Sequence, residues 1–174
     1  MRRLSSEQIM SISALITAVV AVFIAVFELQ ANREYQRLSV EPYLEFSDTN
    51  RNGYERILSN SGLGPARIQT VEVSVRGKDI SNWKEAVQLL TKDDETSIML
   101  SGLWKGRQIK QGELITLLHL KEEITAQKFL ENSHELNMKI CYCSIYKECW
   151  IKEDNKEPLL ISQCPMSNQT SFPY

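Results

Sequence analysis

The feature that most constrains this chain is the uncharged apolar run from residue 9 to residue 27, IMSISALITAVVAVFIAVF. At 1.5 Å rise per residue this run makes a helix about 28 Å long, close to the hydrocarbon thickness of a bilayer. The competing interpretation is a cleaved signal peptide. However, the run is longer than a usual signal core, and Leu29-Gln30-Ala31 offers only a poor cleavage site. We therefore expect an uncleaved transmembrane anchor.

Small residues repeat along one side of this helix at alternating spacings of three and four residues. The repeat ends in a carboxylate and an amide, and its members are Ser11, Ala14, Ala18, Ala21, Ala25, Glu28 and Asn32. Helices in lipid associate through close backbone approach and polar contacts, both of which small residues allow. A period of 3.5 residues favours left-handed packing against parallel copies. This small-residue seam predicts a homo-oligomer, and we favour a tetramer.

Glu28 lies on the seam near the membrane boundary. In an oligomer, its copies form a ring of carboxylates, and acidic rings line many cation-conducting pores. The predicted pore or gate positions are Glu28, Asn32, Ala25, Ala21, Ala18 and Ala14. In the alternative interpretation, alanine is simply common in membrane helices and Glu28 lies among lipid headgroups.

Beyond residue 38 the hydrophobic pattern changes from helical to alternating. It predicts strands at 40–46, 54–58, 67–76, 97–103, 114–120, 136–146 and 149–152, and short helices at 83–90 and 126–130. About seven short strands with two helical insertions are typical of a β-sandwich or a partly open barrel. We divide the chain into a transmembrane helix and stalk (1–38), a β-rich soluble domain (39–157) and a C-terminal tail (158–174). In that tail only Leu159 to Ile161 are expected to reach the core. In the loop 60–66, Gly62 and Gly64 are expected to supply positive φ for a tight turn.

The flanking charges and the cysteines bear on the compartment of the β-rich domain. Two arginines precede the apolar run and two follow it, so the positive-inside rule gives no orientation. Four cysteines permit two disulfides in an oxidising compartment, whereas buried free thiols suit a reducing cytosol. Cys141 and Cys143 point to one face of a strand and cannot easily pair with each other. We favour a cytoplasmic domain.

Signatures of common enzymes are missing from this sequence. It has no Walker loop, no HExxH motif, no nucleophile elbow and no dinucleotide-binding glycine pattern after a strand. His119 and His134 have no second ligand at useful spacing. Cys141, Cys143 and Cys149 form a C-x-C-x5-C pattern without the usual two-residue zinc knuckle, so we expect hairpin packing. We predict no enzyme, catalytic residue, cofactor or metal.

The best local binding candidate is the loop 104–110, WKGRQIK. Lys105, Arg107 and Lys110 supply cationic donors, and Trp104 supplies a ring on which a base can stack. This set suits a nucleotide or a short oligonucleotide. The net charge of -2 gives no general case for nucleic-acid binding, so any such site must be local. The alternative is an exposed loop with solvated charges and a core tryptophan.

Three segments carry a resemblance to known proteins. The runs RLSVEPYL at 37–44, NSGLGPA at 60–66 and CYCSIYKECW at 141–150 resemble a broad group of small bacterial proteins. These have a single N-terminal membrane helix and a β-rich domain. The single span, with its seam and Glu28, is similar in layout to the Hailong-type anti-phage transmembrane effectors (HalB). That resemblance implies a channel-like oligomer, held in check by short DNA oligomers from a partner nucleotidyltransferase.

The expected function is a membrane-anchored homo-oligomeric effector in bacterial anti-phage defence. A ligand-sensing β-rich domain would gate its channel-like helix bundle. It would cross the bacterial inner membrane once. Its expected partners are copies of itself, membrane lipid and a nucleotide or short oligonucleotide made by a partner enzyme. The alternative function is a non-conducting, membrane-anchored interaction module of the bacterial envelope. A monomer in mild detergent, or disulfides among the four cysteines, would favour that alternative.

Overall fold

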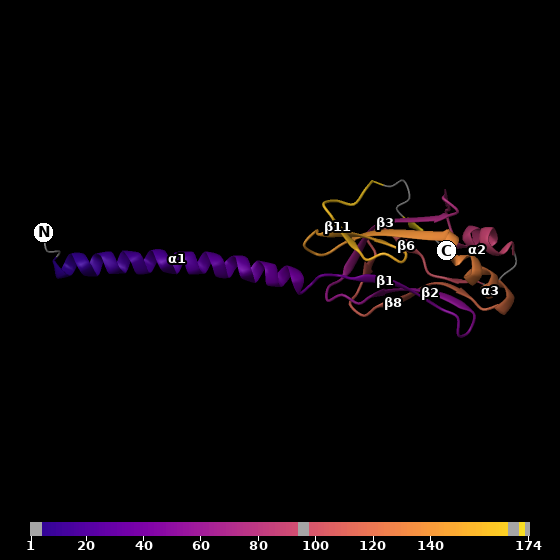
Figure 1. The fold of residues 1–174 in the computed structure, drawn as a ribbon, viewed down its shortest axis with the longest axis horizontal. Helices are drawn as coiled ribbons and strands as arrows, with labels where there is room; N and C mark the ends of the chain where they lie inside the picture. The colour runs from indigo at the N-terminus through magenta and orange to yellow at the C-terminus, as the bar shows by residue number, and fades with distance from the viewer. Residues whose placement is uncertain (1–4, 94–97, 167–170, 173–174) are drawn as a thin grey trace. The chain divides into compact units, whose positions relative to one another are not determined.

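The computed structural model describes residues 5–93, 98–166 and 171–172, and it confirms the predicted fold class. A long N-terminal helix is followed by a mainly-β domain with two short helices, whose sheets are open (Figure 1). The chain divides into two units, Met1–Ser39 and Val40–Tyr174. The first unit matches the predicted helix and stalk within one residue.

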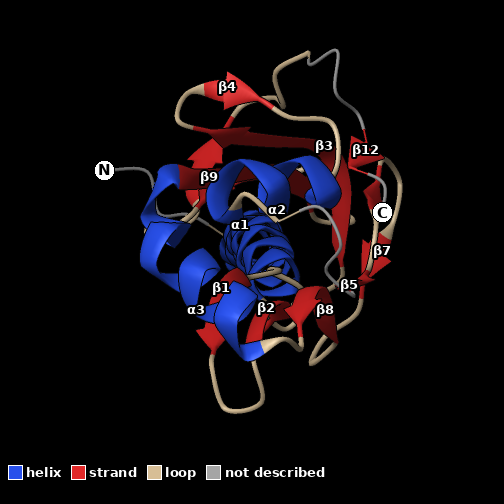
Figure 2. Cartoon of the chain, turned by 90° about the vertical axis from the view of Figure 1, so that its right-hand side faces the viewer, coloured by secondary structure: helices blue, strands red, loops and turns tan. Residues whose placement is uncertain are grey.

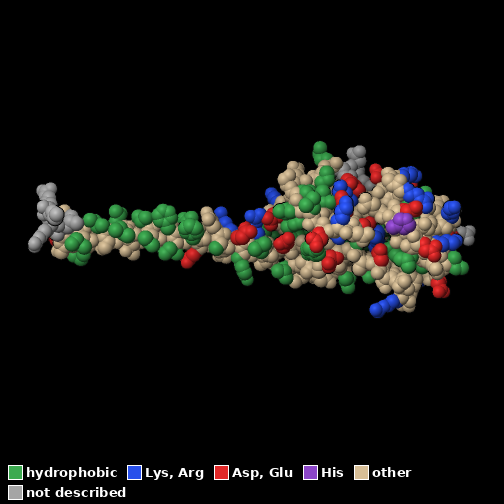
Figure 3. Space-filling view, viewed as in Figure 1, with side chains coloured by type: hydrophobic (Ala, Val, Ile, Leu, Met, Phe, Trp, Pro, Cys, Tyr) green, Lys and Arg blue, Asp and Glu red, His purple; other side chains and the backbone are tan. Residues whose placement is uncertain are grey.

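Helix α1 spans Ser6–Leu38. Ser5 caps its first turn, because the Ser5 hydroxyl accepts a hydrogen bond from the Gln8 backbone N–H and the Gln8 side chain accepts one from the Ser5 N–H. None of the α1 residues is buried within the chain, and apolar side chains cover much of the helix (Figure 3). Within the described residues, α1 is the single helix long and apolar enough to cross a membrane; a signal sequence has the same character.

The first sheet contains the predicted opening hairpin. Its strand order is β1-β2-β8-β5, and every neighbouring pair is antiparallel. The strands are β1 (Leu44–Thr49), β2 (Tyr54–Asn60), β8 (Leu114–Leu120) and β5 (Ile98–Leu100). Gly53, in the turn between β1 and β2, has φ +93°, a conformation that a side chain rarely adopts.

The second sheet contains the predicted closing hairpin, β9–β10. Its order is β11-β10-β9-β3-β4, with β7 paired to the start of β3. The strands are β3 (Ala66–Val75), β4 (Lys78–Asp79), β7 (Gln108–Ile109), β9 (Leu136–Cys143), β10 (Cys149–Glu153) and β11 (Leu159–Ile161). A separate ribbon pairs β6 (Leu103–Trp104) with β12 (Ser171–Phe172).

The core lies between the two sheets, and helices cover one end of it (Figure 2). Helix α2 (Trp83–Thr91) is capped by Asn82, whose side chain accepts a hydrogen bond from Glu85 N–H. Helix α3 (Glu123–Asn132) is followed by a 3-10 turn at Ser133–Glu135. Aromatic side chains join these helices to the strands: the ring centroids of Trp83 and Phe172 lie 5.2 Å apart. The rings of Tyr54 and Phe129 lie 4.7 Å apart.

Three sequence predictions need correction. The strand predicted at 97–103 is two strands in different sheets, since β5 pairs with β8 whereas β6 pairs with β12; residue 97 lies outside the described residues. The helix predicted at 126–130 begins earlier, at Glu123, and buries Thr125 within it. The tail was predicted to reach the core only at Leu159–Ile161, but Leu159 and Leu160 are exposed, and the tail instead supplies Phe172, which is buried against Trp83. The segment 158–174 therefore belongs to the second unit.

The loop 60–66 is organised by the buried side chain of Asn60. Its amide group donates to the carbonyls of Gly64 (2.8 Å) and Ile109 (3.0 Å), and its oxygen accepts from the N–H groups of Tyr43 and Gly62. Gly62 and Gly64 do not adopt the expected positive φ. They are needed for space: a Cβ on Gly64 would lie 1.8 Å from the carbonyl oxygen of Val40.

Candidate functional site

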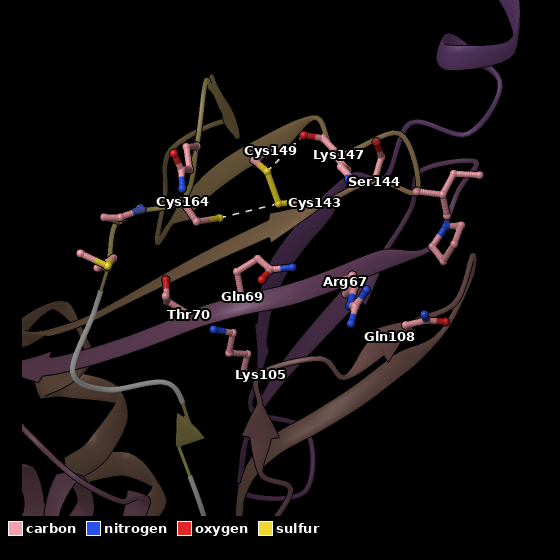
Figure 4. Close-up of a pocket in the computed structure, with 15 residues that line it drawn as sticks. Arg67, Gln69, Thr70, Lys105, Gln108, Cys143, Ser144, Lys147, Cys149 and Cys164 are labelled. Atoms are coloured by element: carbon pink, nitrogen blue, oxygen red, sulfur yellow. Dashed lines mark hydrogen bonds between the residues drawn. A yellow bond between two sulfur atoms is a disulfide. The ribbon is translucent and has the colours of Figure 1, made fainter.

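The described part of the β-domain has a groove of about 770 Å³ (Figure 4). It is lined by β3, β7 and β9, by the β9–β10 turn, and by the tail that follows β11. The lining residues are Pro65, Arg67, Gln69, Thr70, Lys105, Gln108, Cys143, Ser144, Ile145, Lys147, Cys149, Gln163, Cys164, Pro165 and Met166. We call this hollow the sheet groove.

Strand pairing brings the floor of the sheet groove together. Side chains alternate along β3, so Arg67 faces outward while its neighbours Ala66 and Ile68 are fully buried in the core. Arg67 is paired with Gln108 of β7 on one side and with Cys143 of β9 on the other. The groove therefore combines residues that lie far apart in the sequence.

The sheet groove is positively charged. Arg67, Lys105 and Lys147 line it with exposed side chains, and its lining residues in the described part of the chain include no aspartate or glutamate. The amides of Gln69, Gln108 and Gln163 add neutral donors and acceptors, and figure 4 labels Gln69 and Gln108 among the drawn side chains. Cations without carboxylates, next to uncharged polar groups, are suited to bind an anion.

All four cysteines are paired, and three of them, Cys143, Cys149 and Cys164, line the sheet groove. Cys141 is bonded to Cys164 and Cys143 is bonded to Cys149, so the structure contains no free cysteine. The prediction that Cys141 and Cys143 do not pair with each other is confirmed. Of the two alternatives left open by the sequence, disulfides and buried free thiols, the structure has the disulfides, because strand pairing places Cys143 opposite Cys149 and the tail carries Cys164 back to β9.

The predicted binding loop contributes Lys105 and Gln108 to the sheet groove, and of the four predicted binding residues only Lys105 lines it. Trp104 is 51% exposed, but the guanidinium carbon of Arg107 lies 4.8 Å from its ring centroid. Arg107 also donates a hydrogen bond to the carbonyl of Gly102 and lies 3.9 Å from a carboxylate oxygen of Glu113. Arg107 is thus held by contacts within and beside its own loop, and it does not line the sheet groove.

Lys110, the remaining predicted binding residue, is exposed and lies outside the lining of the sheet groove. Its backbone N–H donates to the Glu113 carboxylate, which closes the turn before β8. The two histidines also lie elsewhere: His119 Nε2 is 3.2 Å from the Asn52 carbonyl, and His134 Nδ1 is 3.1 Å from the Glu131 carbonyl. The predicted set of four binding residues therefore does not converge.

The predicted pore residues all lie on α1 and are exposed in the single chain: Ala14, Ala18, Ala21, Ala25, Glu28 and Asn32. Their spacing keeps them on one side of a continuous helix. Because the structure contains one chain, the contact between copies stays a prediction.

Sequence reasoning missed Arg67 and Lys147 as groove residues. Arg67 could have been found from the sequence, because it occupies an outward position of a clearly alternating strand. Gln69 lies on the same face of that strand. Lys147 lies in the β9–β10 turn with φ +67°, and its place beside β3 follows only from sheet pairing.

Comparison with known proteins gives a family assignment. Residues 9–157 match the family described as Domain of unknown function (DUF8453). The matched segment includes most of the apolar helix as well as most of the β-domain. No curated protein and no solved structure matches the chain. The chain belongs to the DUF8453 family.

Proposed function

We propose that this protein is a membrane-anchored, homo-oligomeric effector whose β-domain binds an anionic ligand in the sheet groove. Copies of α1 associate along the small-residue seam and place Glu28 and Asn32 at the shared axis. Ligand binding shifts the balance between two arrangements of the helices, which requires that the ligand bind one arrangement more tightly. The ligand class is a nucleotide or a short oligonucleotide made by a partner enzyme, as in bacterial anti-phage defence.

The observation that carries the anchoring is the exposed apolar surface of α1. None of the residues of α1 is buried within the chain, and its membrane-length segment contains no charge. Apolar surface of this extent needs lipid or another helix to cover it. The family match supports a retained helix, because it begins at residue 9, inside α1, and continues into the β-domain.

The charge of the sheet groove supports the ligand class. A phosphate-rich ligand needs cationic donors, and Arg67, Lys105 and Lys147 come from separate segments that converge on one hollow. At about 770 Å³ the groove is large enough for a nucleotide-sized molecule. The groove differs from the ligand site expected from the sequence, in which Trp104 was to stack on a base and Lys105, Arg107 and Lys110 were to supply cationic donors.

A depolarisation assay tests the effector function. We expect that expression of the full chain without its regulator lowers the membrane potential of bacterial cells, measured with a potential-sensitive dye. Glu28→Ala should change the extent of this depolarisation, since Glu28 lies on the small-residue seam. Glu34→Ala is the matched control, because Glu34 lies on the same helix off the seam, where it pairs with Arg37 at 3.8 Å. An unchanged potential in expressing cells would count against a pore.

The two disulfides favour the second candidate function, a non-conducting interaction module of the bacterial envelope. Disulfides persist in oxidising compartments such as the periplasm. In this alternative, the β-domain binds an envelope protein through a sheet edge, and the seam has no role. Labelling of intact cells with a membrane-impermeant reagent, directed at an engineered surface site on the β-domain, distinguishes a periplasmic from a cytoplasmic domain.

A further inference from the structure

The sulfurs of three cysteines, Cys143, Cys149 and Cys164, lie close together at the end of the sheet groove (Figure 4). The sulfurs of Cys143, Cys149 and Cys164 lie within 4.8 Å of one another, and the sulfur of Cys141 is bonded to that of Cys164. Cys143 and Cys164 belong to different disulfides, yet their sulfurs are 3.8 Å apart. Cys141 and Cys143 lie on β9, Cys149 begins the paired strand β10, and Cys164 lies in the tail.

The separation between the two disulfides matches the sulfur spacing of a tetrahedral metal site, and the two bonded sulfur pairs separate once the disulfides are reduced. Zinc binds thiolate sulfur at about 2.3 Å, so two sulfurs of a tetrahedral site lie about 3.8 Å apart. The Cys143–Cys164 sulfur separation already has this value. The pattern C-x-C-x5-C lacks a zinc knuckle, but the hairpin places Cys143 opposite Cys149, and Cys164 in the tail supplies a ligand that the spacing does not reveal.

The surrounding charge also fits such a site. A zinc ion with four thiolates carries a net charge of minus two, and the adjacent lining of the sheet groove is cationic. Arg67 is paired directly with Cys143 across β3 and β9, and Lys147 stands in the turn between Cys143 and Cys149. Aspartate and glutamate are missing from the described lining of the sheet groove, and Glu148, next to Cys149 in the same turn, is the neighbouring acid outside that lining.

We propose that the reduced chain binds one Zn²⁺ through Cys141, Cys143, Cys149 and Cys164. A dithiol or phosphine reductant supplies four electrons and the solvent supplies four protons, which convert the two disulfides into four thiols. The thiols then release four protons as they bind Zn²⁺, giving a tetrathiolate complex. The zinc form is the state of this cluster in a reducing compartment, and the two disulfides are its state in an oxidising one. The proposal needs neither the pore nor the anionic ligand.

Cobalt(II) titration of the full-length chain in mild detergent, reduced under anaerobic conditions, tests the site. We expect one Co²⁺ per chain, with the visible bands of tetrahedral cobalt and thiolate charge transfer, and displacement of both by Zn²⁺. The same chain after oxidation should show no bands. This comparison uses only the wild-type protein, so it does not depend on the folding of a variant. A reduced chain without these bands would overturn the proposal.

Variants then assign the ligands. Cys164→Ser should weaken cobalt binding by more than about tenfold and shift the bands, because one thiolate is lost. Ser162→Ala, an exposed change two residues away in the same tail segment, should leave binding unchanged. Unaltered bands in Cys164→Ser would remove Cys164 from the site and contradict the four-cysteine assignment. None of these results bears on the oligomer or the anion groove, so failure here is separate from failure of the proposed function.

Discussion

The guanidinium of Arg56 on β2 lies 3.2 Å from the carboxylate of Asp154, which follows β10, and this contact joins the two sheets. Both side chains are almost fully buried. Arg56 also pairs with Asp48 at 3.0 Å, and Asp154 accepts a hydrogen bond from Met138 N–H at 2.7 Å. Burial raises the pKa of Asp154, an effect that the charge of Arg56 opposes. The two sheets are therefore connected by a charge pair in addition to apolar contacts.

Removing Asp154 should destabilise the β-domain strongly. Asp154→Ala leaves the buried Arg56 guanidinium with one carboxylate partner, and breaking a buried pair costs about 3–5 kcal/mol. Asp48→Ala should cost less, because the Asp48 side chain is 32% exposed and the contact between the sheets remains. Urea unfolding of the full chain in mild detergent, followed by tryptophan fluorescence, measures both. Equal losses would contradict the role of Asp154 as the connection between sheets.

Replacing Asn60 should also destabilise the β-domain, but for a different reason. Asn60→Ala leaves the carbonyls of Gly64 and Ile109 without their side-chain donor, at about 1–3 kcal/mol for each buried group left unpaired. Ser61→Ala is the control, since Ser61 is the exposed next residue and its hydroxyl makes only a long contact of 3.4 Å. The same urea measurement applies. A loss in Asn60→Ala no larger than in the control would show that the loop does not depend on this amide.

Acid should weaken the fold through paired glutamates. The hydrogen bond from Arg76 lowers the pKa of Glu135 from its ordinary 4.5, and the Lys156 hydrogen bond lowers that of Glu153. A lowered pKa means that the stabilisation is present above pH 4.5 and is lost as the pH falls through the native value. Asp154 has the opposite sign, since its raised pKa favours the native state at low pH. We expect stability to decline below about pH 4.5.

The contribution of Glu135 to the pH dependence of stability can be isolated by substitution. Glu135→Gln should flatten the decline in stability below pH 4.5, because the Arg76 pair is gone at every pH. Glu123→Gln removes one negative charge without touching Arg76 and serves as the control. Thermal unfolding of the full chain at several pH values gives the comparison. An unaltered acid profile in Glu135→Gln would rule out this pair as a source of the effect.

Charge reversal in the sheet groove should abolish anion binding. Labelled oligodeoxythymidine is the probe, and fluorescence anisotropy with the full chain in mild detergent gives its affinity. Arg67→Glu and Lys147→Glu should each weaken binding by about tenfold or more, with a weaker salt dependence. Lys84→Glu on α2 is the matched control, because Lys84 is exposed and outside the groove lining. Equal affinity in all variants would place the ligand elsewhere.

Local periodicity predicted the individual elements well. The strand predicted at 114–120 is β8 residue for residue, and the one predicted at 67–76 is β3 shifted by one residue, ending before Arg76 at φ +53°. The side chains of these strands alternate between apolar and polar or are mainly apolar, so the sequence pattern alone is enough to locate them. Phe172 was missed because its two-residue strand gives no period, and its burial depends on packing against Trp83 at a distance of 89 positions in sequence.

The candidate site was less predictable because pairing between distant strands creates it. Lys105 was identified as a cation in a loop, but its partners in the groove, Arg67 and Lys147, come from β3 and from the β9–β10 turn. Trp104 and Arg107 contact each other, and neither lines the sheet groove. The cysteine pairs likewise depend on the path of the tail. The composition of a single loop cannot reveal that residues from distant strands meet in one groove.

The mass of the full-length complex in mild detergent tests the central claim most directly, which is that copies of α1 associate along the small-residue seam. We predict a multimer, with a tetramer favoured, for the wild-type chain. Replacing Ala18 and Ala21 by leucine should convert it to a monomer, because larger side chains prevent close backbone approach. A monomeric wild-type chain, or a multimer that survives both substitutions, would contradict the account.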